Sequence, residues 1–267
     1  MTYYIIDAFA DSLFSGNPAG VCIVDKPVSD DIMQKIAFEN NLSETAFVQK
    51  IGDEYLLRWF TPTFEIDLCG HATLAAAFAV FNYIEQASDI IRFNTLSGIL
   101  TVERKGDIYE MSFPIRKPEK VQATDEIINA LGFIPAQLYS QRDLYAVVDS
   151  EEDVLNYVPN YDKLSKLDKW LGIAITAKGK DCDFVSRFFC PELKLEDPVT
   201  GSSHSSLVPL WSEKLNKTEF TARQLSKRSG TLYCKLCEND IKISGRAVLY
   251  LQGGIMCGQT LDRANKI

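Results

Sequence analysis

An internal repeat is the feature that most constrains how this chain can fold. Residues 58–67 read RWFTPTFEID, and residues 187–196 read RFFCPELKLE, at a constant offset of 129 residues. A turn glycine follows each segment, Gly70 in the first copy and Gly201 in the second, at an offset of 131. Matches in one order with a slowly growing offset indicate two copies of one structural unit.

Each copy is predicted to contain strands, a turn and a buried helix. After Gly70 the chain enters residues 74–81, an Ala-rich apolar stretch without Gly or Pro, which favours a helix with almost no polar face. The second copy predicts a corresponding turn and helix near residues 200–215. We therefore expect an α/β protein with two similar halves, whose helix N-termini both point into one cleft.

The boundary between the halves is predicted at residues 117–121, just after Pro114. The N-terminal half then covers residues 1–117, with its central helix starting at Gly70. The C-terminal half covers residues 118–267, with its central helix starting at Gly201. Local patterns predict strands at residues 3–9, 21–24, 42–48, 55–60, 173–176, 184–189, 231–237, 241–243 and 247–252, and further helices at 30–39, 124–131, 162–170 and 221–227.

Composition argues against several classes of function. The 267 residues carry a net charge of −8, which argues against nucleic acid or an anionic membrane surface as a partner. The apolar run at residues 74–81 is far shorter than the ~20 residues that a membrane-spanning helix needs. The N-terminus shows no basic region followed by a long apolar run, so a cytoplasmic location is expected.

The cysteines are predicted to be free thiols, because their number is odd and no secretion signal is evident. They are Cys22, Cys69, Cys182, Cys190, Cys234, Cys237 and Cys257. Cys234 and Cys237 have redox or zinc spacing, but residues i and i+3 on a strand point to opposite faces. No second Cys or His pair supports zinc, so we expect structural thiols and no metal site.

The two helix starts are predicted to bind a small anion. The first amides of a helix have no intrahelical partner, and the aligned dipoles place about half a positive charge there. Two such ends suit a small carboxylate such as an amino or hydroxy acid. The amides concerned belong to residues 70–73 and 201–203, and include those of Gly70, Ala72, Gly201 and Ser203.

The two copies differ in the side chains that could do chemistry. His71 follows the first turn glycine, and Ser202 follows the second. At an offset of 129, Glu44 corresponds to Ile173, and Asp197 lies in a two-residue insertion, so neither is expected to have an acidic counterpart. One acid and one base on opposite sides of a pseudo-symmetric cleft are typical of an isomerase that moves a proton.

Each candidate also has a structural interpretation. On a strand over residues 42–48, Glu44 would share an apolar face, where desolvation suits a carboxylate to proton transfer; alternatively, it lies in water at a strand end. The structural roles open to the remaining candidates are a helix cap or core residue for His71, an Asp-Pro turn for Asp197, an N-cap for Ser202 and a turn residue for Asn17. His204 is expected to be structural.

Four motifs, read together, carry a family resemblance: GNPAG at residues 16–20, NLSETAF at 41–47, LCGHAT at 68–73 and EDPVTGS at 196–202. Over essentially the whole chain, the sequence resembles the PhzF-like (phenazine biosynthesis) family. The resemblance implies the diaminopimelate epimerase-like fold, with two pseudo-symmetric halves that each wrap a mostly antiparallel sheet around a central helix.

The resemblance also implies residue roles. Glu44 would be the base, Asp197 a proton donor or relay, and His71 and Ser202 polar partners at the helix starts; Asn17 lies in the first motif as a candidate ligand contact. Family members use no metal or organic cofactor and are commonly homodimers. The characterised activity is isomerisation of a dihydro-hydroxyanthranilate, while most members have no assigned substrate. We therefore expect a cofactor-independent isomerase of a small carboxylate.

Two further functions compete with this interpretation. In the related epimerases a cysteine precedes each turn glycine, and the two thiols act as an acid/base pair. Here Cys69 has the first such position but Thr200 has the second, and a Thr hydroxyl is far too weak an acid, so an amino-acid epimerase with two thiols is disfavoured. The second competing function is that of a non-catalytic protein that binds small carboxylates, and the presence of both Glu44 and Asp197 argues against it.

Overall fold

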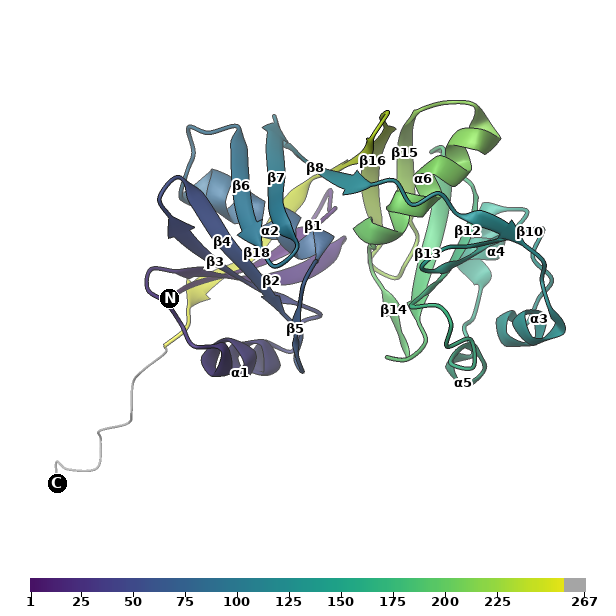
Figure 1. Ribbon diagram of the computed structural model, residues 1–267, viewed down its shortest axis with the longest axis horizontal. Helices are drawn as coiled ribbons and strands as arrows, with labels where there is room; N and C mark the ends of the chain where they lie inside the picture. Colours follow the sequence, from purple (N-terminus) through teal and green to yellow (C-terminus); the bar gives the residue numbers. More distant parts are fainter. Residues whose placement is uncertain (257–267) are drawn as a thin grey trace, which may run out of the picture.

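The strands of both repeats join in one continuous sheet in the computed structural model, which describes residues 1–256. The first repeat contributes β1 (Thr2–Ala8), β2 (Asn17–Val24), α1 (Asp30–Asn40), β3 (Thr45–Ile51), β4 (Glu54–Phe60), β5 (Glu65–Ile66), α2 (Gly70–Tyr83), β6 (Ile90–Thr95), β7 (Gly98–Lys105) and β8 (Ile108–Pro114). Figure 1 shows these elements as one lobe, coloured purple and blue.

The second repeat, apart from its last strand, forms the other lobe, in teal and green (Figure 1). Its elements are β9 (Glu119–Val121), α3 (Asp125–Leu131), β10 (Gln137–Ser140), β11 (Leu144–Val147), α4 (Glu151–Asn156), α5 (Tyr161–Leu164), β12 (Ile173–Lys178), β13 (Phe184–Cys190), β14 (Leu195–Asp197), α6 (Gly201–Leu215), β15 (Glu219–Gln224), β16 (Gly230–Leu236), β17 (Asp240–Gly245) and finally β18 (Ala247–Gly254).

The order of strand pairing is the same in both repeats. β1 pairs with β2 antiparallel, β2 with β3 parallel, β3 with β4 antiparallel, and β4 with both β5 and β6. β10 to β15 repeat this order, ending with β13 paired to both β14 and β15. α2 and α6 take the same place in each order. The division at residues 1–117 and 118–267 stays a prediction, which this agreement favours.

The strand that follows each repeat pairs with the other repeat. β9 follows β8 in the chain but pairs with β10, and β18 follows β17 but pairs with β1, with Thr2 opposite Gly254. In Figure 1 the yellow β18 accordingly lies in the first lobe. Residues 247–254 of the predicted C-terminal half therefore complete the first lobe, and backbone hydrogen bonds tie the lobes together.

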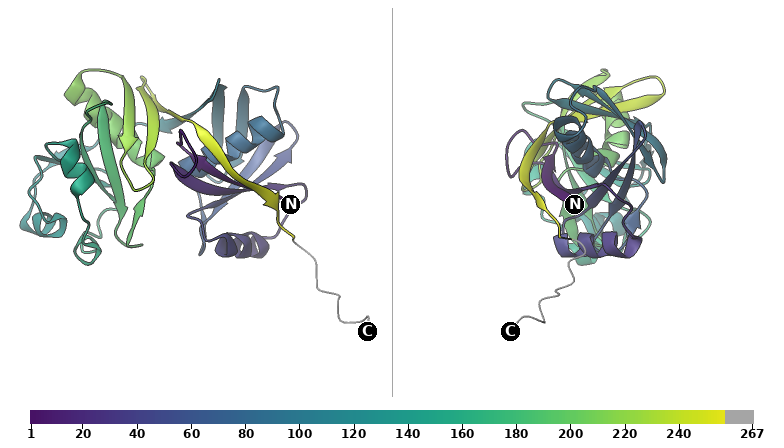
Figure 2. Two further views of the ribbon diagram at one scale, coloured as in Figure 1. Left: turned by 180° about the vertical axis from the view of Figure 1, so that it is seen from behind. Right: turned by 90° about the vertical axis from the view of Figure 1, so that its left-hand side faces the viewer.

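Both central helices begin at their turn glycines, as predicted. Nearly all of α2 is buried, which confirms the expected helix without a polar face, and the end-on view in Figure 2 shows strands around it. The Phe113 ring packs against both helix starts. A Cβ atom added at Gly70 would lie 3.0 Å from its Cζ atom, and one added at Gly201 would lie 3.9 Å away. This ring therefore lies beside both helix starts.

Three predicted elements differ in the structure. Residues 221–227 are predicted as a helix, but residues 219–224 form β15, whose buried residues alternate and which pairs with β16. The helix predicted at 162–170 is reduced to α5 at Tyr161–Leu164. The strand predicted at 21–24 begins earlier, as β2 at Asn17, because Asn17 pairs with Ala8. In each case strand pairing or packing outweighs a local preference.

The predictions for the cysteines and for a membrane-spanning helix can be compared with the structure. Cys69, Cys182, Cys190, Cys234 and Cys237 are free thiols, as predicted, and Cys257 lies outside the described residues. Burial raises the pKa of the Cys234 thiol on β16, which fits a structural role. Within residues 1–256, no helix is both long and apolar enough to cross a membrane.

Candidate active site

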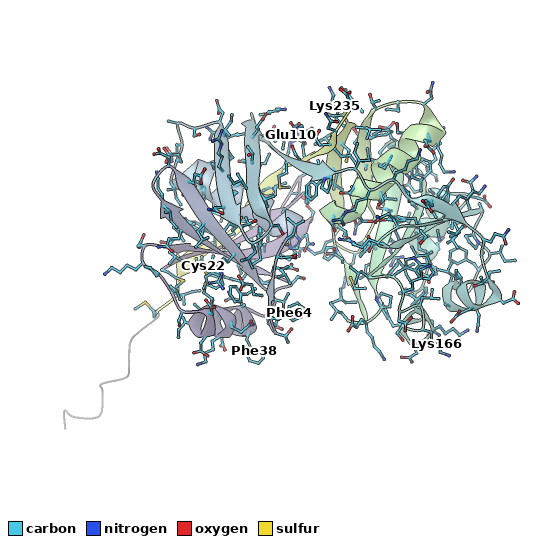
Figure 3. The ribbon with its side chains drawn as sticks, viewed as in Figure 1. Cys22, Phe38, Phe64, Glu110, Lys166 and Lys235 are labelled. Atoms are coloured by element: carbon cyan, nitrogen blue, oxygen red, sulfur yellow. The ribbon has the colours of Figure 1, made fainter. Side chains whose placement is uncertain are left out.

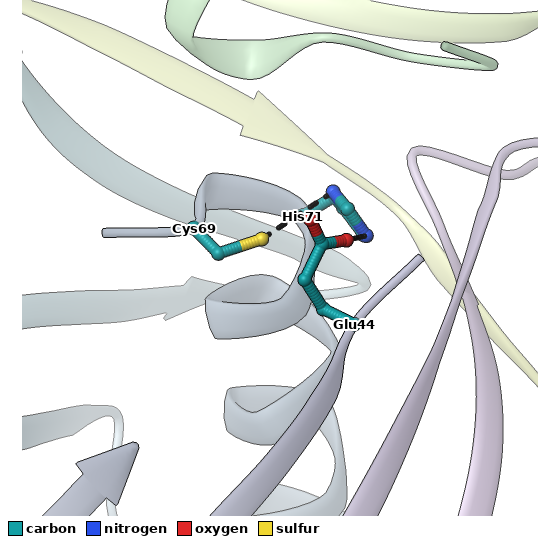
Figure 4. A group of neighbouring side chains, drawn as sticks. All are labelled: Glu44, Cys69 and His71. Carbon is teal, nitrogen blue, oxygen red and sulfur yellow. Dashed lines mark hydrogen bonds and ion pairs between the residues drawn. The ribbon is translucent and has the colours of Figure 1, made fainter. Parts of the chain in front are cut away.

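Glu44, His71 and Cys69 form a chain of contacts at the start of α2 (Figure 4). Oε2 of Glu44 lies 3.0 Å from Nε2 of His71. Sγ of Cys69 lies 3.6 Å from Nδ1, the other nitrogen of the same ring. The sequence places these groups together because Cys69 is the N-cap of α2 and His71 is its second residue.

Glu44 lies in the loop just before β3, which begins at Thr45. Its backbone carbonyl accepts a hydrogen bond from the Gly20 N–H (3.1 Å), which fixes the loop beside β2. The side chain is mostly buried and faces the imidazole of His71. Both interpretations of its environment are thereby corrected. Glu44 lies before the strand and not on its apolar face, and its carboxylate faces the ring nitrogen of His71 and not bulk water.

The contacts around His71 shift its protonation. Burial alone would lower the pKa of His71, but its interactions with Cys69 and Glu44 outweigh burial and hold that pKa well above its ordinary value. Burial, followed by the charge of Glu44, raises the pKa of the Cys69 thiol. The arrangement thus favours an imidazolium beside a carboxylate, and it keeps the thiol protonated near neutral pH.

Asn17 connects this group to the second repeat. Its Nδ2 atom donates to Oδ1 of Asp197 (2.7 Å) and to the carbonyl of Val199 (2.9 Å), and lies 3.3 Å from Nδ1 of His71. The side chain is fully buried, and its Oδ1 atom has no hydrogen-bond partner within the described chain. Asn17 is therefore a strand residue of β2 that holds the acid of one lobe beside the imidazole of the other.

Asp197 is the last residue of β14, opposite Phe188 on β13. Its Oδ2 atom accepts a hydrogen bond from the Thr200 hydroxyl (2.5 Å). Burial raises the pKa of Asp197 from 3.8 to about 6, outweighing the opposite effects of His71 and Thr200. A carboxyl group with this pKa exchanges protons readily near neutral pH, as a proton donor or relay must.

Strand register corrects the counterparts expected for the two acids. The Leu144 N–H donates to the Gly172 carbonyl, as Gly20 does to Glu44, so Glu44 corresponds to Gly172 rather than to Ile173. Ile66 on β5 pairs with β4 as Asp197 on β14 pairs with β13. The extra residues therefore lie in the turn before β14, and Asp197 has an apolar counterpart.

Sequence reasoning missed Arg142, which contacts the start of α6. Its Nη2 atom donates to Oγ of Ser202 (3.1 Å) and to Oδ2 of the neighbouring Asp143 (2.9 Å). Ser202 is the second residue of α6, whose N-cap is Thr200, so the N-cap interpretation of Ser202 is wrong. Arg142 lies in the short turn between β10 and β11, and an Arg-Asp pair in a turn carries no local signal of a site.

The helix starts keep several backbone amides available. Neither Cys69 nor Thr200 caps its helix with a side-chain hydrogen bond, as far as the described residues show. The Thr73 N–H already bonds to the Cys69 carbonyl (3.1 Å), so this one of the amides expected to bind an anion is occupied. Binding by the amides of Gly70, Ala72, Gly201 and Ser203 stays a prediction.

His204 lies one turn into α6 and has the structural place expected for it. Its Nδ1 atom contacts the Thr200 carbonyl (2.9 Å), and the ring is fully buried. Burial lowers the pKa of His204 to about 4, so its imidazole is neutral and donates to the carbonyl.

The start of α2 also holds three groups of the kind that bind metal ions. Glu44, Cys69 and His71 offer three donor atoms that lie within 4.8 Å of one another. The sulfur and the carboxylate, however, lie beside different nitrogens of the ring, and one ion can bind only one of these nitrogens. The arrangement fits a chain of acid/base groups better than a coordination sphere, and the expectation of no metal stays a prediction.

A cavity of about 420 Å³ lies elsewhere, among residues of β8 and β15–β17. Glu110 and Lys235, which line it, mark its place near the upper edge of Figure 3. Lys105 pairs with Glu110 (2.5 Å), and Lys235 pairs with Glu219 (2.8 Å). None of the candidate acid/base residues lines this cavity, so we assign the candidate site to the helix starts instead.

Comparison with known proteins shows the family to which the chain belongs. A family model described as phenazine biosynthesis-like protein (PhzC-PhzF) matches residues 6–253. The chain belongs to this family. A curated member, an uncharacterized isomerase of Pseudomonas aeruginosa, is 46% identical over 95% of this chain and 98% of its own length. A crystal structure of a PhzC/PhzF protein from Clostridium difficile is 55% identical, with a TM-score of 0.94 over 96% of this chain and 99% of that one.

The likeness in fold extends beyond the phenazine biosynthesis-like family. A hydroxyproline epimerase from Agrobacterium vitis has a TM-score of 0.63 at 11% identity, covering 95% of this chain and 91% of that one. At this identity the comparison concerns the fold alone, and it confirms the expected epimerase-like α/β class. The names of three curated relatives support an isomerase activity, with an unknown substrate.

Proposed function

We propose that this protein is a cofactor-independent isomerase that moves a proton on a small carboxylate between its two lobes. The substrate would be an amino or hydroxy acid or a cyclic relative of one. The observation that carries the proposal is the meeting of Glu44 and His71 with Asp197 from the other repeat, joined by the buried Asn17. Acid/base groups with shifted pKa values, held at hydrogen-bond distance, are suited to proton transfer.

Glu44 is proposed as the general base. Its carboxylate takes a proton from a carbon next to a carbonyl or similar group, and the electron pair of the broken C–H bond moves into that group. His71, 3.0 Å away, stabilises the charge as an imidazolium, and its own proton is the one that it can return. As the electron pair returns, protonated Asp197 or the His71–Glu44 pair delivers a proton to form the new C–H bond. Only protons and electron pairs move, so the proposal needs no metal or organic cofactor.

Substrate binding is proposed at the two helix starts. The amides of Gly70, Ala72, Gly201 and Ser203 and the hydroxyl of Ser202 would hold the carboxylate, since helix N-termini favour negative charge. From the family resemblance we also propose that the protein is a cytoplasmic homodimer. Light scattering of the purified protein would measure the mass of the particle and so test the dimer.

Two competing functions make different predictions. A non-catalytic binding protein of the same fold would bind small carboxylates but exchange no proton with solvent. An amino-acid epimerase with two thiols needs a thiol before each helix, and Thr200 stands before α6. The deciding experiment incubates the protein with a panel of small carboxylates in D₂O and measures deuterium uptake by mass spectrometry. Uptake into a panel member supports the isomerase, and binding without uptake supports the non-catalytic binding protein.

A further inference from the structure

The two helix starts face opposite charges. At α2, the Glu44 carboxylate contacts His71. At α6, the corresponding helix residue Ser202 is contacted by the Arg142 guanidinium. The position that corresponds to Glu44 is Gly172, where an added Cβ atom would lie 2.0 Å from the Phe188 ring, so no acidic side chain fits there. The second repeat therefore presents a cation where the first presents an anion.

Arg142 is held in a fixed orientation. Its Nε and Nη2 atoms donate to the two carboxylate oxygens of Asp143, at 3.2 and 2.9 Å. Asp143 is only 1% exposed, and it also accepts a hydrogen bond from the Tyr145 hydroxyl (3.1 Å). The Arg142 side chain is 31% exposed, and no residue of the described part of the chain bonds its Nη1 atom. One edge of the guanidinium is anchored, and Nη1 is left to donate to another group.

The charges of both repeats converge near the end of β13, where Cys190 lies. Burial raises the pKa of the Cys190 thiol to about 12; the carboxylates of Asp197, Asp143 and Glu44 add to this rise, and Arg142 opposes it. These four charged groups therefore lie within electrostatic reach of one side chain. Arg142 belongs to the same region as the acid/base groups, since it contacts Ser202 at the start of α6, where the Thr200 hydroxyl donates to Asp197.

We propose that Arg142, together with Ser202, binds the carboxylate of the substrate at the start of α6. The proposal rests on the proposed function and adds to it a specificity residue. The Glu44 carboxylate repels an anionic group, whereas an oriented guanidinium donates charge-assisted hydrogen bonds to it. The carboxylate would thus settle beside Arg142, and the reacting carbon would be turned toward Glu44. The site then selects organic anions over their neutral amides.

Matched acid and amide probes test this assignment. Acetate, lactate and benzoate are titrated into the protein beside acetamide, lactamide and benzamide, and binding is followed by NMR line shapes. The wild type should bind at least one acid more tightly than its amide. Arg142→Gln should lower the affinity for that acid by about 10- to 100-fold, the effect expected for a lost charged hydrogen bond. The affinity for the amide should not change. Arg142→Lys should recover part of the lost affinity for the acid. Ser202→Ala should lower this affinity less than Arg142→Gln does.

Further variants keep the test independent of folding. Because Arg142→Gln leaves Asp143 buried without its partner, the double variant Arg142→Gln/Asp143→Asn removes both charges and should bind as the single variant does. Arg92→Gln, an exposed arginine on β6, should bind as the wild type does. The proposal is overturned if no acid binds better than its amide, or if Arg142→Gln and the double variant both keep wild-type affinity.

The outcome is separable from the proposed function. Loss of acid binding in Arg142→Gln, with proton exchange retained in Glu44→Gln, would support the carboxylate site and overturn the base assignment. Unchanged acid binding in Arg142→Gln, with exchange abolished in Glu44→Gln, would overturn the carboxylate site and leave the isomerase in place.

Discussion

Asn17 donates a hydrogen bond of 2.7 Å to Asp197, although 180 residues separate the two in the chain. This bond joins the start of β2 in the first lobe to the end of β14 in the second. It places the acid of one repeat beside the imidazole of the other. The candidate chemistry therefore depends on how the lobes are joined as much as on either helix.

We expect Asn17→Ala to destabilise the protein. The change removes the donor to Asp197 and to the Val199 carbonyl, and it leaves these acceptors unsatisfied. A lost buried hydrogen bond of this kind costs about 1–3 kcal/mol, which urea unfolding at pH 7 would measure. Asn239→Ala, at an exposed position, is the control and should stay within about 0.5 kcal/mol. Equal unfolding free energies for the two variants would contradict this role of Asn17.

Glu44→Gln should abolish proton exchange while leaving the fold and ligand affinity nearly intact, because the amide is isosteric with the carboxylate. Removing a positioned general base typically costs ~10²–10⁴-fold in rate. The measurement is deuterium uptake on a substrate found in the carboxylate panel. Glu126→Gln, an exposed glutamate on α3, is the matched control. Near wild-type exchange by Glu44→Gln would show that the base lies elsewhere, and Cys69 would be the next candidate.

Asp197 should make stability depend on pH. Its pKa is about 6 in the folded protein against an ordinary 3.8, so between these values the folded state binds more protons than the unfolded state. The contribution is therefore fully present below pH 3.8 and is lost as pH rises through 6. Asp197→Asn stays neutral and can keep the bond to Asn17.

The unfolding free energy of the wild type and Asp197→Asn should be compared from about pH 3 to about pH 7.5, a range that spans both pKa values. As pH rises across this range, the unfolding free energy of the variant should increase relative to that of the wild type by about 1–3 kcal/mol, since one pKa unit corresponds to ~1.4 kcal/mol. Groups that titrate in both proteins cancel in the difference. A difference that does not change with pH would contradict the raised pKa of Asp197.

Cys69→Ala should retain most of the exchange activity, with less than about a tenfold change in rate. Burial raises the pKa of this thiol, so little thiolate is available near neutral pH to act as a base. Cys237→Ala, on a partly exposed cysteine after β16, serves as the control. A loss as large as that expected for Glu44→Gln would instead favour a thiol-based epimerase.

The sequence predicted the central helices well because their signals are local. Gly70 and Gly201 start α2 and α6, and the apolar run after Gly70 is buried. The helix α4 was missed although Ser150 and Asp153 form a capping box at its start, a signal that is present in the sequence. Residues 219–224 were misjudged because their preference for a strand comes from pairing with β16.

The sequence predicted most residues of the candidate site but only part of their arrangement. Glu44, His71 and Asp197 were identified from motifs, and the structure brings them together. Arg142 was not identified, because the contact that makes it a candidate is with Ser202. Ser202 lies 60 residues away in the chain, and the two side chains meet only in the folded protein.

The sequence by itself determined that this chain contains two copies of one unit, each with a turn glycine and a central helix, because these patterns lie within single short segments. Only the tertiary structure decided which side chains meet. Asn17 reaches Asp197 because β18 crosses to β1 and β17 pairs with β8, which holds the two lobes edge to edge. Such contacts depend on strand register over more than a hundred residues, and hydrogen bonds of that range leave no periodic trace in the local sequence.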